Sequence, residues 1–160
     1  MMPEEIKKPT ILIIDDVMAN IKILGSTLQP DYEILFALNA QDGIESVLAN
    51  RPSLILLDIL MPDIDGYEVC RRLKTDEQTR DIPVIFITSR DSDDDEARGF
   101  EVGAVDYITK PFSPVVVKAR IKTHVELKKQ SDFLEWMLRE KSKELHEIEK
   151  EYMKLFIRTS

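Results

Sequence analysis

Five short, almost wholly apolar segments recur along the first 125 residues of this chain, and they constrain its fold more than any other feature. Stretches with apolar residues at helical spacing separate them. Continuously apolar runs of this kind are typical of parallel strands that are covered on both faces of a sheet. The alternation therefore predicts an α/β fold with a doubly wound, five-stranded parallel sheet. The predicted strands are Thr10–Ile14, Tyr32–Ala37, Ser53–Leu57, Val84–Thr88 and Val105–Ile108, and the helices between them are Ala19–Leu28, Ala40–Ala49, Gly66–Lys74 and Asp93–Val102.

Carboxylates stand at the carboxyl ends of two of these strands. Asp15 and Asp16 follow the first strand, and Asp58 follows the third. Because the carboxyl ends of parallel strands meet at one edge of a sheet, we expect these side chains to lie together, with Thr88 and Lys110 at the same edge. Neighbouring carboxylates at the ends of buried strands repel one another and are costly to desolvate. A divalent cation would resolve that conflict, and a ligand set of oxygens alone suits Mg²⁺.

Charge and cysteine content exclude several functional classes. The chain has 160 residues and a formal net charge of −8, which argues against generic nucleic-acid binding and against docking on an anionic membrane. Its one cysteine, Cys70, excludes an internal disulfide, and we expect a buried structural thiol there. No segment approaches the roughly 18–20 apolar residues that span a bilayer, and Met1–Lys8 has no apolar signal-peptide core. We therefore expect a cytoplasmic protein.

The last predicted helix is much longer than the others. Ser113 can be its N-cap and Pro114 its first residue, and neither Gly nor Pro follows before the end of the sequence. Steps of four and three residues define a heptad seam, which favours a self-associating coiled coil. The alternative is a helix that folds back on its own domain or docks on a segment outside this sequence, because Phe133, Trp136 and Phe156 lie off the seam. The apolar seam residues are Leu127, Leu134, Leu138, Leu145, Ile148, Tyr152 and Leu155, with Ser131 and Lys141 as polar exceptions.

Four motifs, in this order, resemble the receiver domain of two-component response regulators. They are Ile14-Asp15-Asp16, the stretch from Leu57 to Gly66, Ile87-Thr88-Ser89 and the segment from Asp106 to Pro111. The resemblance covers about Lys8 to Val125. It implies a flavodoxin-like receiver with strand order 2-1-3-4-5 over residues 10–125. A polar tail (residues 1–9) would precede it, and an extended C-terminal helix (residues 126–160) would follow.

The resemblance also implies a role for each site residue. Asp58 would accept a phosphoryl group from a sensor histidine kinase or a phosphotransfer protein. Mg²⁺ would neutralise charge on the phosphoryl group, and Lys110 would supply a further positive charge. The implied metal ligands are Asp15, Asp16, Asp58 and the backbone carbonyl of Leu60, and the implied phosphoryl-binding groups are Thr88, the backbone N–H of Ser89 and Lys110.

Switching and output follow from the same resemblance. Thr88 and Tyr107 would be the switch pair, and Lys110–Pro111 stands where the family usually holds a cis peptide. Leu60 and Arg90 offer no carboxylate or amide to position an attacking water, so we expect slow self-dephosphorylation. The signal would pass through the last helix to a homodimer or to an output domain on a longer chain.

Other functions fit parts of the pattern. Phosphatases of the haloacid-dehalogenase-like class also use a strand-end aspartate, but they need a second Asp two residues later, where this chain has Leu60. A dinucleotide site needs a phosphate cradle after the first strand, where Asp15 and Asp16 would repel phosphate. A receiver-like adaptor that works without phosphorylation would not need the complete site. We therefore expect a signalling phosphoacceptor rather than an enzyme.

Overall fold

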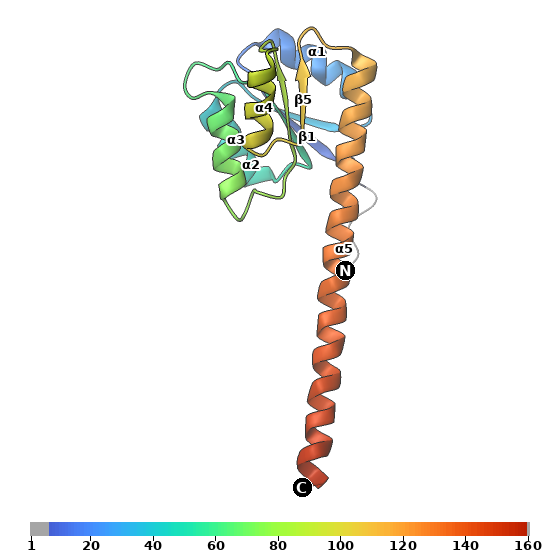
Figure 1. The fold of residues 1–160 in the computed structure, drawn as a ribbon. Coiled ribbons are helices and arrows are strands. Elements are labelled where there is room, and N and C mark those ends of the chain that lie inside the picture. Colours follow the sequence, from blue (N-terminus) through green and yellow to red (C-terminus); the bar gives the residue numbers. More distant parts are fainter. Residues whose placement is uncertain (1–6, 160) are drawn as a thin grey trace. The chain divides into compact units, whose positions relative to one another are not determined.

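The computed structural model describes residues 7–159 of the chain (Figure 1). Most of the predicted polar tail, residues 1–6, lies outside the described residues. Strands and helices alternate along the chain, as the spacing of the apolar runs predicts. The elements are β1 (Thr10–Ile14), α1 (Met18–Leu28), β2 (Glu33–Ala37), α2 (Ala40–Asn50), β3 (Leu54–Leu57), α3 (Gly66–Thr75), β4 (Val84–Thr88), α4 (Asp93–Glu101), β5 (Asp106–Thr109) and α5 (Pro114–Thr159).

All five strands are parallel and form one sheet in the order β2-β1-β3-β4-β5, which confirms the predicted fold class. The register between β1 and β3 decides where the site forms. Ile14 is paired with Leu57, and the N–H of Asp58 donates to the carbonyl of Ile14 at 3.0 Å. The residues that follow these two strands therefore leave the sheet side by side.

Helices cover both faces of the sheet (Figure 1). Because side chains alternate along a strand, Leu12 and Ile14 lie in a core with residues of α2 and α3. Ile11 and Ile13 lie in a second core, which α1 and the first part of α5 complete. The central strands β1, β3 and β4 thus have no solvent-facing side, which explains why they lack the polar alternation of a half-exposed sheet, whereas Phe36 of the edge strand β2 is 52% exposed.

Several helices begin where a side chain satisfies the first backbone N–H groups. Asn39, Asp65 and Ser92 each accept a hydrogen bond from the N–H three residues later, at the starts of α2, α3 and α4. Several element ends differ from the predicted ones by one residue; β5, for example, begins at Asp106 instead of Val105. End residues keep only part of the hydrogen-bond pattern of an element, so periodicity does not define them sharply.

Contacts divide the described chain into two compact units, one ending at Lys128 and the other beginning at Lys129. The second unit is the later part of α5. The apolar seam residues of α5, from Leu127 to Leu155, are exposed by 53–68% in this single chain. Within the part of the chain that the structure describes, none of the helices has the length and hydrophobicity needed to cross a bilayer.

Candidate functional site

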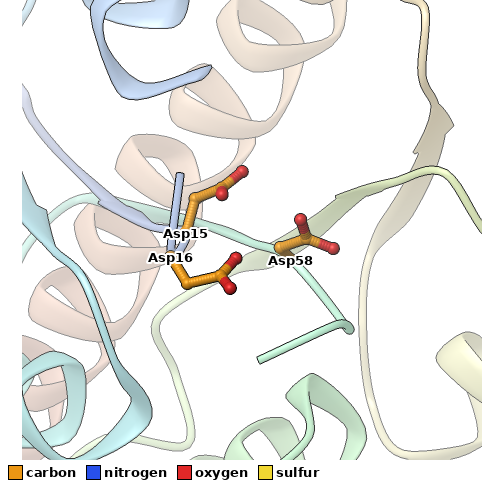
Figure 2. A group of neighbouring side chains, drawn as sticks. All are labelled: Asp15, Asp16 and Asp58. Carbon is orange, nitrogen blue, oxygen red and sulfur yellow. The ribbon is translucent and has the colours of Figure 1, made fainter. Parts of the chain in front are cut away.

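Three carboxylates meet at the carboxyl ends of β1 and β3 (Figure 2). Asp15, Asp16 and Asp58 each offer an oxygen atom, and these oxygens all lie within 4.8 Å of one another. Asp15 is 2% exposed and Asp58 is 7% exposed, whereas Asp16 is open to solvent. The structure thus brings together the three acids that the strand ends predicted.

An ammonium group lies between the two buried acids. Lys110, in the connection between β5 and α5, places its Nζ 2.9 Å from Asp15 Oδ2 and 2.9 Å from Asp58 Oδ2. Burial lowers the pKa of Lys110, but its hydrogen bonds to Asp15 and Asp58 outweigh burial, so the pKa is raised above its ordinary value. The backbone N–H of Lys110 donates to the carbonyl of Thr88 at 2.8 Å, and the Lys110–Pro111 peptide bond is cis.

The two buried acids also accept hydrogen bonds from other groups. Asp15 Oδ1 accepts from the N–H of Val17 at 2.9 Å, and the amide of Asn20 donates to Asp15 Oδ2 at 3.2 Å. Asp58 Oδ1 accepts from the N–H of Leu60 at 3.1 Å. The sequence reasoning missed Asn20. The sequence feature that could have indicated Asn20 is its position in the first turn of the helix that follows Asp15.

The donor set fits a divalent cation. Three carboxylates and one ammonium give the cluster a formal charge of −2, with two of the acids buried. Mg²⁺ prefers oxygen ligands and is held in proteins by one or two carboxylates together with water. Asp15, Asp16 and Asp58 could therefore hold it, and the acidic pocket is consistent with the metal that receiver domains bind.

The loop from Asp58 to Asp65 packs closely onto the start of α3. The N–H of Gly66 donates to the carbonyl of Ile59 at 2.9 Å. A Cβ atom at Gly66 would collide with the carbonyl oxygen of Asp58, so only glycine permits this approach. Leu60, whose carbonyl is the predicted fourth ligand, has a side chain that is 44% exposed.

The predicted phosphoryl-binding and switch residues lie around the end of β4. Thr88 is fully buried, and its Oγ1 accepts from the N–H of Arg90 at 3.4 Å. Ser89 follows it and is exposed. Tyr107 is 5% exposed, and its hydroxyl donates to the carbonyl of Arg90 at 2.7 Å. Burial, and then the neighbouring Tyr67, raise the pKa of Tyr107 well above its ordinary value.

Other ionisable residues have structural roles. The acidic residues from Asp93 to Glu96 form the first turn of α4, where the helix dipole favours negative charge. Cys70 is fully buried, and burial raises the pKa of its thiol to about 11. His124 lies in the first part of α5, and its Nε2 is 3.1 Å from Asp106 Oδ2. The helical spacing of the sequence does not predict this contact.

The comparisons with known proteins agree with this geometry. Residues 11–122 match the family described as the response regulator receiver domain. A probable cyclic di-GMP phosphodiesterase of Vibrio cholerae is 42% identical over 135 residues, which are 84% of this chain and 30% of that protein. The phosphate regulon transcriptional regulatory protein PhoB of Pseudomonas aeruginosa is 46% identical over 114 residues, which are 71% of this chain and 50% of that protein.

A solved structure supports the same assignment. A putative response regulator from Chloroflexus aurantiacus superposes with a TM-score of 0.72 at 31% identity, covering 75% of this chain and 99% of that one. The chain spans only half or less of the length of the two curated relatives named above. From the strand order, the acidic cluster with its lysine, and these matches, it follows that this chain belongs to the response regulator receiver domain family of two-component signalling.

Proposed function

We propose that Asp58 is the phosphoacceptor and that a phosphohistidine on a sensor histidine kinase or a phosphotransfer protein is the donor. A carboxylate oxygen of Asp58 attacks phosphorus, a new P–O bond forms, and the P–N bond to the imidazole breaks. The bond's electron pair stays on the departing nitrogen, which takes a proton from solvent. The geometry that supports this proposal is the placement of Asp58 beside two further carboxylates and a lysine at one edge of the sheet.

The residues around Asp58 have separate tasks in this proposal. Asp15, Asp16, Asp58 and the Leu60 carbonyl would hold Mg²⁺, which would neutralise charge on the transferring phosphoryl group. Lys110 already lies 2.9 Å from Asp58, so its ammonium group meets the phosphoryl oxygens without a large movement. The Thr88 hydroxyl and the Ser89 N–H donate to the same oxygens.

The observation that carries this proposal is the 2.9 Å contact of Lys110 with both buried acids. The test is Asp58→Asn, incubated with labelled acetyl phosphate and Mg²⁺. We expect label to be lost in this variant and to be retained in Asp94→Asn, which changes an exposed carboxylate at the start of α4. Labelling of Asp58→Asn at the wild-type rate would show that another residue accepts the phosphoryl group.

Readout in this proposal uses Thr88 and Tyr107. Thr88 turns toward the phosphoryl group, and the ring of Tyr107 shifts toward the space that Thr88 leaves. The ring starts from an already buried position, 5% exposed, with its hydroxyl donating to the Arg90 carbonyl at 2.7 Å. We also infer slow self-dephosphorylation, because the exposed Leu60 and Arg90 side chains offer no carboxylate or amide to position an attacking water. Phosphate release with a half-life of seconds would contradict that inference.

We further propose that α5 carries the signal to a second copy of this chain in the cytoplasm. The extension over residues 126–160 presents seven exposed apolar seam residues, which a parallel coiled coil would bury. A second arrangement, an output domain on a longer chain, is favoured by one match. The similarity to the Vibrio cholerae protein extends over 135 residues, beyond the segment 11–122 that the family matches. Sedimentation of this chain tests the first arrangement, because only that one requires a dimer and a chain that stays monomeric would exclude it.

A further inference from the structure

The loop between β3 and α3 carries an acid, Asp63, that the proposed phosphoryl site does not use. Asp63 Oδ1 accepts from the N–H of Ala40 at 3.2 Å, and Asp63 Oδ2 accepts from the N–H of Gln41 at 3.2 Å. Ala40 and Gln41 are the first two residues of α2. A carboxylate from one segment thus binds the amino end of a helix that begins 23 residues earlier in the chain.

This contact is not needed to start α2, because the helix has its own N-cap. Asn39 Oδ1 accepts from the N–H of Asp42 at 2.8 Å. The first N–H groups of a helix have no partner within it, and Asp63 takes two that Asn39 leaves. Slight burial raises the pKa of Asp63, but backbone N–H groups, chiefly those of Ala40 and Ile64, outweigh it, so the pKa is lowered and the group is charged at neutral pH. What Asp63 adds is a link between the loop and the helix.

The middle of the loop has few other anchors of this strength. Its beginning is held by the bond from the Leu60 N–H to Asp58, and its end by the bond from the Gly66 N–H to the Ile59 carbonyl. Between them, Met61 and Ile64 are only partly buried against the core. The Leu60 side chain is 44% exposed and does little to hold its own backbone in place.

We infer that Asp63 is a positioning residue for the metal site. By binding the amino end of α2, it fixes the loop and so holds the Leu60 carbonyl in the position from which it would bind the metal. The inference rests on the proposed function, since it assumes that Leu60 lies in the metal-binding loop. Groups that orient a metal ligand without touching the metal commonly affect metal affinity. Asp63 would be such a group, acting on Leu60 from three positions further along the backbone.

The test is the Mg²⁺ affinity of Asp63→Ala, measured by calorimetry, together with the rate of labelling by acetyl phosphate across a Mg²⁺ series. We expect the dissociation constant for Mg²⁺ to rise about threefold to tenfold, as the loss of a capping interaction allows. At saturating Mg²⁺ the rate should stay within about twofold of wild type, because bound metal restores the loop. Asp63→Asn can accept with one oxygen only, so its dissociation constant for Mg²⁺ should lie between those of wild type and Asp63→Ala.

Two control variants separate the clamp from simpler causes. Asn39→Ala removes the N-cap of the same helix and leaves the loop untouched, so it should destabilise the protein without changing Mg²⁺ affinity. Asp65→Asn removes one negative charge from the same loop but keeps the cap of α3, because Asn caps as well as Asp. It should change Mg²⁺ affinity by less than about twofold, since exposed charges are screened by salt.

The outcomes are distinct. Equal Mg²⁺ affinity of wild type and Asp63→Ala would overturn the inference, and so would an equal loss in either control. Absence of Mg²⁺-dependent labelling in the wild-type protein would count against the proposed function, while calorimetry would still measure the clamp.

Discussion

The two parts of α5 use apolar residues in opposite ways. In the first part, Val117 and Ile121 are fully buried and Val125 is 4% exposed, and all three lie in the core beside β5. In the later part, Leu134, Leu138 and Leu145 are exposed by 59%, 68% and 58% in the single chain. One continuous helix thus passes from intramolecular packing to a face that its own unit leaves open.

The difference teaches how each part is stabilised. The first part gains from apolar burial, which is worth about 1.5–3 kcal/mol for a large side chain. In the later part, ion pairs such as Lys141–Glu144 and Lys154–Glu151 join residues three apart. Such pairs contribute only about 0.2–0.5 kcal/mol each. Most helical stability in proteins comes from burying an apolar face, so we expect a second chain to cover the seam.

The largest expected effect is that of Ile121→Ala on the stability of the receiver. It removes a fully buried side chain and should lower the free energy of unfolding by about 3 kcal/mol, at any protein concentration. Denaturant unfolding at two concentrations measures this. The neighbouring exposed Lys122→Ala should stay within about 0.5 kcal/mol of wild type. Equal effects of the two variants would mean that the first part of α5 is not packed as described.

The same type of substitution in the later part should act on assembly instead. Leu138→Ala removes an exposed seam residue, so the unfolding of the receiver should change by less than about 0.5 kcal/mol. The dissociation constant of the dimer should rise about thirtyfold, which corresponds to about 2 kcal/mol. Sedimentation equilibrium measures this constant. A chain that is monomeric at every concentration would break the comparison between the two parts.

A matched pair of lysines provides a sharper test of the comparison between the two parts of α5. Lys141 lies on the seam and Lys143 lies off it, yet both side chains are 73% exposed and both pair with a glutamate three residues away. Lys141→Leu should tighten the dimer about tenfold, because a polar seam residue costs stability. Lys143→Leu should leave the dissociation constant unchanged within about twofold. Similar tightening by both variants would indicate non-specific association instead of a seam.

The fold could be predicted because its cause is local in sequence. The central strands contain runs that are apolar at every position, such as Ile11–Ile14 and Leu54–Leu57, and the parallel sheet follows from the alternation with helices. Strand order came only with the family resemblance, since apolar runs do not say which neighbour they pair with. The contact of His124 could not be predicted, because helical periodicity cannot show that Asp106 of another element lies 3.1 Å away.

The residues of the site also divide into those that the sequence could predict and those that it could not. Asp15, Asp16 and Asp58 were predictable from strand ends, because parallel strands bring their carboxyl ends to one edge. Asn20 and Asp63 were not. Their roles depend on which N–H or carboxylate lies opposite in the fold, and for Asp63 that partner is 23 residues away. An amide or acid in a loop has many structural uses, so residue type alone does not select one.

The smallest expected effect is a change in dimer affinity that depends on both parts of α5. Asp106, next to the proposed switch residue Tyr107, binds Arg120 at 2.7 Å and His124 at 3.1 Å, so β5 is tied to the first part of α5. Arg120 also donates to the Tyr107 carbonyl at 3.4 Å. A movement of Tyr107 would therefore shift α5, the helix that carries the seam.

We expect beryllofluoride with Mg²⁺, a mimic of the phosphoryl group, to change the dimer dissociation constant about fivefold, near the lower end of allosteric coupling energies. Arg120→Ala should reduce that change to less than about twofold and leave the constant without the mimic nearly as it was. Sedimentation with and without the mimic decides this. Identical assembly in both conditions would mean that the two parts of α5 share a helix but no signal. An undiminished change in Arg120→Ala would instead show that coupling reaches the seam by a route other than the bonds between β5 and α5.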